Sequence, residues 1–442
     1  SRVTRHERQG MEDEKFDAIV VGAGPAGVAA ALTMARAGLE VVVLERGSFA
    51  GAKNVMGGIL YSQPTAEIVP DFWEDAPIER PIIEQRYMLL TEDSHIGLAY
   101  RTQAFSDAPY NSFTVLRADW DQWFAAKAEA EGVFIIPETV VVDLIWREGR
   151  VVGVQTSRED GDLHADVVVI ADGANSLLAL AAGMHKEWQP KEQALVTKEL
   201  IRLGEDVVNE RFNVPDGHGV AMEIFGQSTS YLLGYGFIYT NKDSVSIGSG
   251  ALLSDLIESG INVNDMLERF KAHPSIAPLL AGGETVEYAA HLIPEGGWNS
   301  LPTLYIDGAL VCGDAAMLVN PLNREGSNFA MISGKMAGET IARAKERGDF
   351  SAATLSYYRE LLDESFVMQD LYKIRNVTDF AHSRPYLLSD VPEAISQTLR
   401  EYLRVDSVPK GAKQKAMLRT MRGAFPLGRT LRDALDARKV FT

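Results

Sequence analysis

The strongest constraint on this chain is a glycine-rich turn between two apolar segments near its start. Residues 16–46 read FDAIVVGAGPAGVAAALTMARAGLEVVVLER, in which Gly22, Gly24 and Gly27 follow an apolar run with the spacing G-x-G-x-x-G. The pattern predicts a buried strand, a helix that begins after the glycines, and a second buried strand. Glycines allow the backbone to turn tightly beside a pyrophosphate, which the amides of the helix N-terminus then face. The segment therefore predicts a dinucleotide-binding turn.

An acidic residue at the end of the second strand supports this interpretation. Glu45 lies 21 residues after Gly24, where a carboxylate can accept hydrogen bonds from an adenosine ribose. The alternative is a glycine-rich turn that binds nothing. The strand, helix, second strand and terminal acid together favour the dinucleotide, but they do not distinguish NAD from FAD.

Composition limits the remaining possibilities. The 442 residues suffice for two or three domains, and 46% hydrophobic with 24% charged residues is ordinary for a soluble globular protein. The net charge of −18 argues against nucleic-acid binding. Cys312 is the single cysteine, which excludes an internal disulfide and any cysteine-ligated iron–sulfur cluster held by this chain alone. No metal site is expected.

The charge is distributed unevenly along the chain. Residues 404–442 contain ten Lys or Arg and three Asp, a balance of +7, which leaves −25 for residues 1–403. Such a basic tail on an acidic body suggests contact with something anionic. The candidates are an acidic protein partner, phospholipid, or no partner at all, and we favour docking of a protein.

Changes in the hydrophobic pattern predict the domain organisation. Strand–helix alternation before about 190 resumes after about 300, and separated strands lie between. We expect a discontinuous nucleotide-binding domain (16–190 and 301–350), an inserted antiparallel-sheet substrate domain (191–300), and a helical C-terminal region with the basic tail (351–442). The fold class is α/β.

Four separated motifs together resemble a known family. They are the glycine turn with Glu45, Arg117 opening a helix, and Asp172-Gly173 and Gly313-Asp314 each ending a strand. With these motifs the chain resembles the FAD-dependent oxidoreductases of the glutathione-reductase-like, hydroxylase-type fold. Within that group it is most similar to the FixC and electron-transfer-flavoprotein:quinone oxidoreductase family, relatives of the geranylgeranyl reductases. The segments that carry the narrower resemblance are GAKNVMGGILYS (51–62), ADGANSLLA (171–179), GYGFIYTNKDSVSIGSG (234–250) and GDAAMLVNPLNREGSNFAMISGKMAGE (313–339).

The resemblance implies FAD as the cofactor and a role for individual residues. It places Arg117 near the ribityl-phosphate region, the backbone of Val141 beside the adenine, and Asp314 on a ribityl hydroxyl. The amides around 326–328 would face the pyrimidine edge of the flavin, where a helix N-terminus stabilises negative charge. The implied cofactor-binding residues are Gly22, Gly24, Gly27, Glu45, Arg46, Gly57, Arg117, Val141, Asp172, Asp314, Gly326, Ser327 and Asn328.

Alternating aromatic residues supply the candidates for a substrate site. Tyr235, Phe237 and Tyr239 occupy alternate positions of a predicted strand. They either belong to the core or line a substrate site over the flavin. Because the flavin carries the chemistry, no residue of the chain is nominated as a catalytic acid or base.

The function implied by the resemblance is electron transfer. The chain would be an FAD-dependent subunit that passes electrons from an electron-transfer flavoprotein to a membrane quinone, in a FixABCX-like, electron-bifurcating assembly. Its implied partners are the electron-transfer flavoprotein subunits and a small ferredoxin-like FixX-type iron–sulfur subunit, and its implied location is the cytoplasmic, inner face of the membrane. Two alternatives remain: a geranylgeranyl-reductase-like enzyme acting on prenyl lipids, and a flavin-bearing relay that does not itself reduce quinone.

Overall fold

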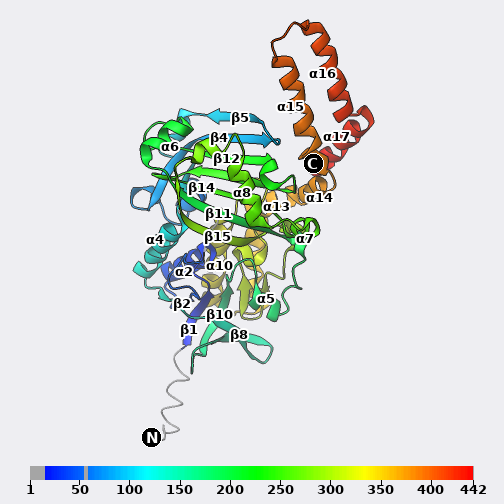
Figure 1. Cartoon of the computed structure of the whole chain (residues 1–442). Helices are drawn as coiled ribbons and strands as arrows, with labels where there is room; N and C mark the ends of the chain where they lie inside the picture. The colour runs from blue at the N-terminus through cyan, green and yellow to red at the C-terminus, as the bar shows by residue number, and fades with distance from the viewer. Residues whose placement is uncertain (1–14, 54–57, 442) are drawn as a thin grey trace, which may run out of the picture. The chain divides into compact units, whose positions relative to one another are not determined.

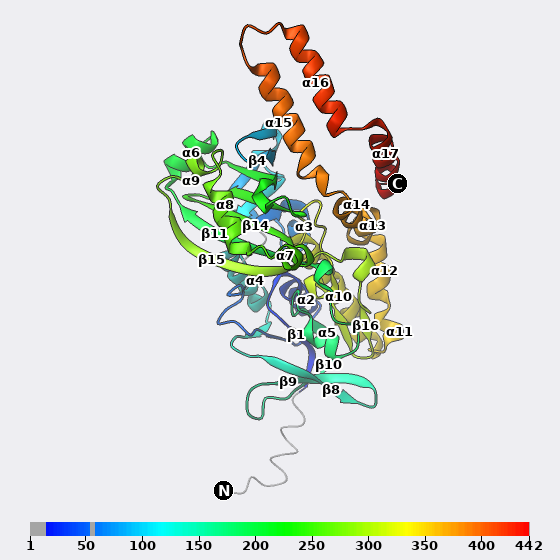
Figure 2. The same cartoon turned by 45° about the vertical axis from the view of Figure 1, so that its right-hand side comes forward.

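The computed structural model describes residues 15–53 and 58–441 and divides the chain into two compact units (Figures 1 and 2). Each unit is assembled from three separate stretches of sequence. Unit 1 consists of the described residues up to Ile78, Val115–Trp188 and Gly296–Tyr372; unit 2 consists of Glu79–Thr114, Gln189–Glu295 and the described residues from Lys373 onward.

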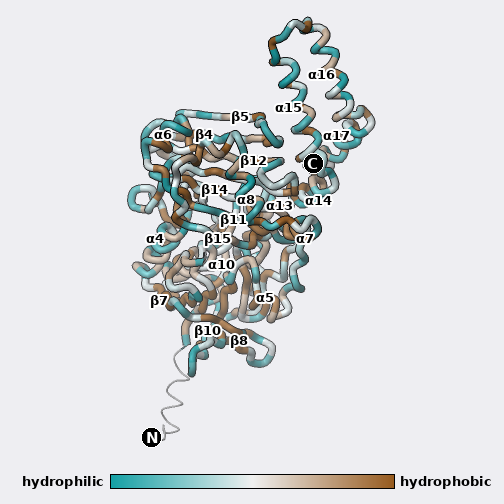
Figure 3. Tube along the Cα trace, viewed as in Figure 1, coloured by the Kyte–Doolittle hydropathy of each residue, from teal (hydrophilic) through white to brown (hydrophobic). Residues whose placement is uncertain are grey.

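Unit 1 is built on a largely parallel sheet in the order β16-β17-β10-β1-β2-β7. The central strands are almost wholly apolar and buried, as expected for a parallel sheet that is covered by helices. In Figure 3 much of the tube around the β10 label is brown, the apolar colour. The strands are β1 (Lys15–Val21), β2 (Val41–Leu44), β7 (Phe134–Ile136), β10 (Leu163–Ile170), β16 (Tyr305–Ile306) and β17 (Ala309–Val311), with β8 (Val141–Arg147) and β9 (Arg150–Thr156) forming a hairpin on β10 and β3 (Ile59–Tyr61) elsewhere in the unit.

Two long helices of unit 1 pack against each other beside this sheet. They are α2 (Pro25–Arg36) and α10 (Ser327–Arg347). A Cβ atom on Gly334 of α10 would lie only 2.0 Å from the carbonyl oxygen of Ala26, so a glycine is needed for this close approach. The other helices are α3 (Ser62–Ala66), α4 (Arg117–Ala130), α5 (Leu177–Ala181), α11 (Ala352–Leu355), α12 (Tyr357–Glu364) and α13 (Phe366–Ile374).

Unit 2 contains a predominantly antiparallel sheet in the order β15-β11-β14-β13-β12-β4-β6, with β5 paired to β4. Its core is formed by alternate strand residues, among them Ile224, Ile238 and Ile247, together with Phe270 of α8 (Val263–Ala272). The strands are β4 (Ile78–Leu90), β5 (His95–Arg101), β6 (Ser112–Val115), β11 (Gln193–Arg202), β12 (Gly219–Gly226), β13 (Gly234–Thr240), β14 (Ser244–Leu252) and β15 (Glu284–Pro294), and the helices are α6 (Glu205–Phe212), α7 (Leu253–Ser259), α8 (Val263–Ala272) and α9 (Ala277–Leu280).

The units differ from the expected domains in two respects. The expected C-terminal region (351–442) is divided between them after Tyr372 instead of standing alone. Residues 79–114 were expected in the nucleotide-binding domain, but the structure groups them with unit 2. The reason is that β4 pairs in parallel with β12 over Ile82–Leu90 and Gly219–Gly226, a contact between segments far apart in the sequence.

The chain ends in helices that also belong to unit 2. These are α14 (Val377–His382), α15 (Asp390–Leu403), α16 (Lys410–Ala424) and α17 (Leu427–Phe441). Figures 1 and 2 both show α15 and α16 running side by side in opposite directions. Residues 351–442, expected to be helical, do form a series of helices, with interruptions at Ser356, Ser365 and Asn376 among others. None of the described helices combines the length and apolarity needed to cross a membrane.

Candidate functional site

The glycine turn between β1 and α2 has the geometry of a phosphate-binding loop. Gly22 has φ +105°, and a Cβ atom on it would lie 2.3 Å from the carbonyl oxygen of Ala171. A Cβ atom on Gly27 would lie 1.9 Å from the carbonyl oxygen of Gly22. Gly24 precedes α2, and no side chain of the described residues caps the helix, so its first amides can face an anion. The three glycines therefore make a close-packed turn around an uncapped helix N-terminus.

Glu45 is held rigidly at the end of β2, beside this turn. Its Oε2 accepts a hydrogen bond from the amide of Ala23 (2.9 Å), and its Oε1 accepts one from the amide of Gly47 (2.6 Å). The side chain is buried, while neighbouring Arg46 is exposed. Each carboxylate oxygen has a second acceptor position, so this arrangement leaves capacity for ribose hydroxyls.

The segment before Val141 is hydrogen-bonded to the backbone at Glu45 and Gly47. The amide of Thr139 donates to the carbonyl oxygen of Glu45 (2.8 Å), and that of Glu138 donates to the carbonyl oxygen of Gly47 (2.8 Å). Val141 begins β8 two residues later and is half-buried. Its predicted place near the adenine is therefore compatible with the local connections.

Arg117 connects the start of α4 with the start of α10. Its Nε and Nη2 donate to the two carboxylate oxygens of Asp121 at 2.7 and 2.9 Å, and its Nη1 donates to Ser327 Oγ at 3.4 Å. Both members of the Arg117–Asp121 pair are buried. Asp121 was not predicted as a site residue, although an acid four residues after a helical arginine was the available signal.

Two partly buried carboxyl groups lie at strand ends beside the turn. Burial raises the pKa of Asp314 to about 6, and the charge of Arg117 opposes that rise. Burial also raises the pKa of Asp172. Its Oδ2 accepts from the amide of Leu178 (3.1 Å), whereas its Oδ1 has no hydrogen-bond partner among the residues that the structure describes. Buried acceptors of this kind gain stability from a ligand hydroxyl or water.

The N-terminus of α10 offers a further set of free groups. Gly326 precedes the helix, and none of the side chains that the structure describes caps it. Asn328 is buried, and within the described part of the chain its Oδ1 has no hydrogen-bond partner. Its Nδ2 donates to Glu325 Oε1 (3.3 Å), and Glu325 Oε2 accepts from Asn320 (3.0 Å). Glu325 was missed by the sequence analysis because it lies in a loop without periodicity.

These groups fit an extended dinucleotide with a flavin at one end. The glycine cradle suits a pyrophosphate, Glu45 suits a ribose, and the orphaned acceptors on Asp172 and Asn328 suit donors of a bound ligand. Contacts connect the predicted residues: Arg117 contacts Ser327, and a Cβ atom on Gly313 would lie 2.7 Å from the Cβ atom of Ala26. Gly57 lies outside the described residues.

The predicted substrate residues belong to unit 2. Phe237 and Tyr239 stack on each other with ring centroids 4.8 Å apart and are buried, and Tyr235 packs on Phe225 at 6.2 Å. Their role in substrate binding stays a prediction. Tyr235 is the least buried of the three.

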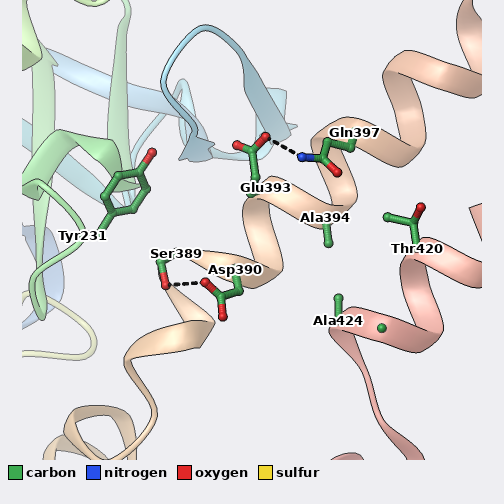
Figure 4. A pocket seen from close by; sticks show the side chains of 9 residues that line it. Tyr231, Ser389, Asp390, Glu393, Ala394, Gln397, Thr420 and Ala424 are labelled. Atoms are coloured by element: carbon green, nitrogen blue, oxygen red, sulfur yellow. Dashed lines mark hydrogen bonds between the residues drawn. The ribbon is translucent and has the colours of Figure 1, made fainter.

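A groove in unit 2 contains none of the predicted site residues. It has a volume of about 460 Å³ (Figure 4). Glu393 accepts a hydrogen bond from Gln397 (3.1 Å), and burial together with the charge of Glu393 raises the pKa of Tyr231. The lining residues are Tyr231, Ser389, Asp390, Glu393, Ala394, Gln397, Thr420, Gly423 and Ala424.

Similarity to known proteins decides the family. Residues 17–213 match the FAD dependent oxidoreductase family, and residues 377–442 match the ETF-QO/FixC family C-terminal domain. Protein FixC of Azorhizobium caulinodans is 46% identical, with 92% of this chain and 95% of that protein covered. The chain belongs to the ETF-QO/FixC family. A second relative in this family, the probable electron transfer flavoprotein-quinone oxidoreductase YdiS of Escherichia coli K12, is 41% identical over 92% of this chain and 95% of its own length.

Solved structures support the same fold. A geranylgeranyl bacteriochlorophyll reductase-like protein from Thermoplasma acidophilum has a TM-score of 0.73 at 19% identity, covering 97% of this chain and 99% of that one. A flavin-dependent brominase has a TM-score of 0.63 at 17% identity, covering 93% and 100%. This ETF-QO/FixC family member is therefore an FAD-dependent oxidoreductase of electron transfer, and the predictions of family, fold class and cofactor are confirmed.

Proposed function

We propose that this protein accepts electrons from an electron-transfer flavoprotein and delivers them to a membrane quinone. The observation that supports the proposal most is the similarity along nearly the whole chain to FixC proteins and to a probable electron transfer flavoprotein-quinone oxidoreductase. It includes the C-terminal region, which matches a domain named for this family. Bound FAD supplies the electron-transfer chemistry, and the chain supplies position and electrostatics.

Individual residues of unit 1 would hold the cofactor. Glu45 would accept hydrogen bonds from the ribose, because its carboxylate is already fixed by two backbone amides. The uncapped N-terminus of α10, with Ser327 and Asn328, would stabilise negative charge at the pyrimidine edge. Arg117 would add positive charge near the phosphates while its guanidinium stays fixed by Asp121. We retain Gly22, Gly24 and Gly27 as the pyrophosphate cradle.

The assembly we propose is FixABCX-like and electron-bifurcating, at the inner face of the membrane. It would contain the electron-transfer flavoprotein subunits and a FixX-type ferredoxin-like subunit. A separate subunit would have to supply any cysteine-ligated iron–sulfur cluster, because Cys312 is the single cysteine of this chain. The purified chain is expected to carry FAD but no iron. In the domain division we propose, unit 1 binds FAD and the sheet of unit 2 meets the quinone.

The proposal is tested by reconstitution. Reduced electron-transfer flavoprotein, the FixX-type subunit and this protein are mixed, and reduction of a water-soluble short-chain quinone is followed optically. We expect quinone reduction that depends on the FAD-loaded chain and is lost when FAD is absent. Oxidation of the reduced protein by a prenyl lipid alkene instead of quinone would favour the reductase alternative. Electron uptake without quinone reduction would favour the relay.

A substitution at Glu45 tests the assignment of the cofactor site. Glu45→Arg replaces the fixed carboxylate with a cation next to the amides of Ala23 and Gly47, so FAD occupancy should fall strongly. Glu40→Arg, at an exposed position just before β2, is the control with the same charge change. Unchanged occupancy in Glu45→Arg would remove Glu45 from the ribose site.

A further inference from the structure

The C-terminal helices carry an unusual excess of positive charge. Residues 407–432 contain seven Lys or Arg and no Asp or Glu. On α16, Lys415, Arg419 and Arg422 share one face with Leu418, because residues three, four and seven apart are neighbours on a helix. All four are exposed, and none of the three cations forms an ion pair with any described residue. We call these four residues the basic face of α16.

The acidic residues nearest in the sequence are already engaged. Asp406 pairs with Lys413 (2.9 Å). Asp433 and Asp436 both pair with Arg384, at 2.9 and 2.7 Å. These carboxylates are therefore committed to other cations and do not neutralise the basic face.

The pairing with Arg384 also fixes which side of α17 is exposed. Asp433, Asp436 and Val440 lie on the side that contacts the rest of unit 2, and Val440 is buried. Leu427, Leu431 and Leu435 lie on another side, four residues apart, with 80%, 62% and 60% of their surface exposed. We call these three residues the leucine stripe of α17.

We infer that the basic face of α16 and the leucine stripe of α17 bind the surface of a bilayer that contains anionic phospholipid. Exposed leucines and unpaired cations on adjacent helices, with no acid in residues 407–432, are the composition of an interfacial membrane-binding element. Each cation near an anionic bilayer adds an electrostatic attraction of about the same size, so several cations act together.

The alternative of an acidic protein partner is less well supported by these faces. The core of a protein interface is typically enriched in aromatic residues and surrounded by a polar rim. The two faces instead present aliphatic side chains and cations only. The sequence alone favoured protein docking, and the exposed leucines change that preference. The inference rests on the proposed function in one respect, because delivery to a membrane quinone requires contact with the bilayer.

The first experiment measures binding of the FAD-loaded full chain to vesicles. Phosphatidylcholine vesicles are compared with vesicles that also contain phosphatidylglycerol, and bound protein is quantified by sedimentation. The variant is Lys415→Gln/Arg419→Gln/Arg422→Gln. We expect its affinity for the anionic vesicles to fall about 100-fold, because three cations are removed.

A matched control removes the same charge elsewhere in unit 2. Lys191→Gln/Lys242→Gln/Arg269→Gln changes three exposed cations that form no ion pair with a described residue. It is expected to bind anionic vesicles like the unmodified protein. Equal losses in the two triple variants would overturn the inference, because net charge alone would then explain binding. Normal vesicle binding by the α16 variant, with loss of FixX-type subunit capture, would overturn it in favour of protein docking.

The second experiment tests the leucine stripe. Leu431→Cys is labelled with an environment-sensitive fluorophore, which is selective because Cys312 is fully buried and burial raises the pKa of its thiol to about 12. We expect a blue shift with phosphatidylglycerol vesicles and quenching by lipids with brominated acyl chains. An unchanged spectrum on bound vesicles would exclude α17 from the membrane contact.

Failure of this inference can be distinguished from failure of the proposed function. Vesicle binding is measured without quinone or electron-transfer flavoprotein, so it does not depend on electron transfer. The α16 variant should still reduce a water-soluble quinone in the reconstituted assay, since that acceptor needs no bilayer. Loss of both activities together would indicate a folding defect, which the FAD absorbance and the circular dichroism of the variant detect.

Discussion

The candidate FAD site of unit 1 contains charged groups that are buried and paired, whereas α16 of unit 2 exposes most of its cations. In the site, Arg117 is buried with both carboxylate oxygens of Asp121 as partners, and Glu45 accepts two backbone amides. On α16, Lys415 and Arg419 are exposed and form no ion pair within the described residues. A site for one small cofactor gains from charges that are fixed before it binds. A contact with an extended anionic surface instead requires charges that stay accessible.

The largest effect should come from filling the glycine turn. Gly27→Ala places a Cβ atom 1.9 Å from the carbonyl oxygen of Gly22, an overlap with backbone that no side-chain movement relieves. We expect loss of FAD binding and a fall of more than about 4 kcal/mol in the free energy of unfolding. FAD absorbance and thermal unfolding measure both. A stable variant with full FAD content would show that the turn is less rigid than the structure indicates.

The next effect concerns the buried ion pair. Arg117→Gln leaves the buried carboxylate of Asp121 without its bidentate partner, so the free energy of unfolding should fall by about 3 kcal/mol and FAD affinity should fall as well. The matched control is Arg359→Gln on α12, which removes an exposed pair with Asp363 at the same i,i+4 spacing and should change stability by less than about 1 kcal/mol. Denaturant titration of both variants provides the comparison, and equal effects would contradict it.

A smaller effect, with a defined pH dependence, is expected at Asp314. Burial raises its pKa to about 6, so the folded state carries a penalty that is absent below the unfolded pKa of about 4. The penalty grows as the pH rises from about 4 to about 6 and is complete above that. In the FAD-free protein, Asp314→Asn should therefore increase the free energy of unfolding by about 2 kcal/mol at pH 8 and by nothing at acidic pH. A gain that is independent of pH would indicate a packing effect instead.

The smallest effect is expected from a glycine-to-alanine substitution on exposed α16, the counterpart of Gly27→Ala. A Cβ atom on Gly423 of α16 would meet no heavy atom within 4 Å. Gly423→Ala should increase the free energy of unfolding by about 0.5 kcal/mol, because alanine favours the helix. Thermal unfolding at constant pH measures the change. Destabilisation would mean that α16 packs more closely than the structure shows, and the contrast with Gly27→Ala would weaken.

The local parts of the site were predictable from sequence, whereas its long-range parts were not. The turn at Gly22, the helix opened by Arg117 and the strand before Asp314 were predicted because glycine spacing and apolar runs are local signals. The partnership of Arg117 with Ser327 joins residues 210 positions apart, and no periodicity reveals it. The predicted roles of these residues toward FAD stay predictions.

The same limit explains the placement of residues 79–114. Within this segment β4 pairs with its neighbour in sequence, β5, as an antiparallel hairpin. Its membership of unit 2 depends on the parallel pairing of β4 with β12, which only the folded chain brings together. The leucine stripe of α17 is the reverse case. Its spacing of four is visible in the sequence, but only the pairing of Asp433 and Asp436 with Arg384 shows that the stripe faces outward.

The discontinuity of unit 1 has a consequence for the order in which the protein is made. β1 pairs with β10, and β10 in turn pairs with β17, which the ribosome adds roughly 290 residues after β1. At a synthesis rate of about 5–20 residues per second, β1 is made roughly 15–60 s before β17 completes the sheet. Throughout that interval the apolar strands of the nascent chain lack their final neighbours. Newly synthesised chains therefore expose these apolar strands until β17 and α10 are made, and a complete FAD site requires both elements.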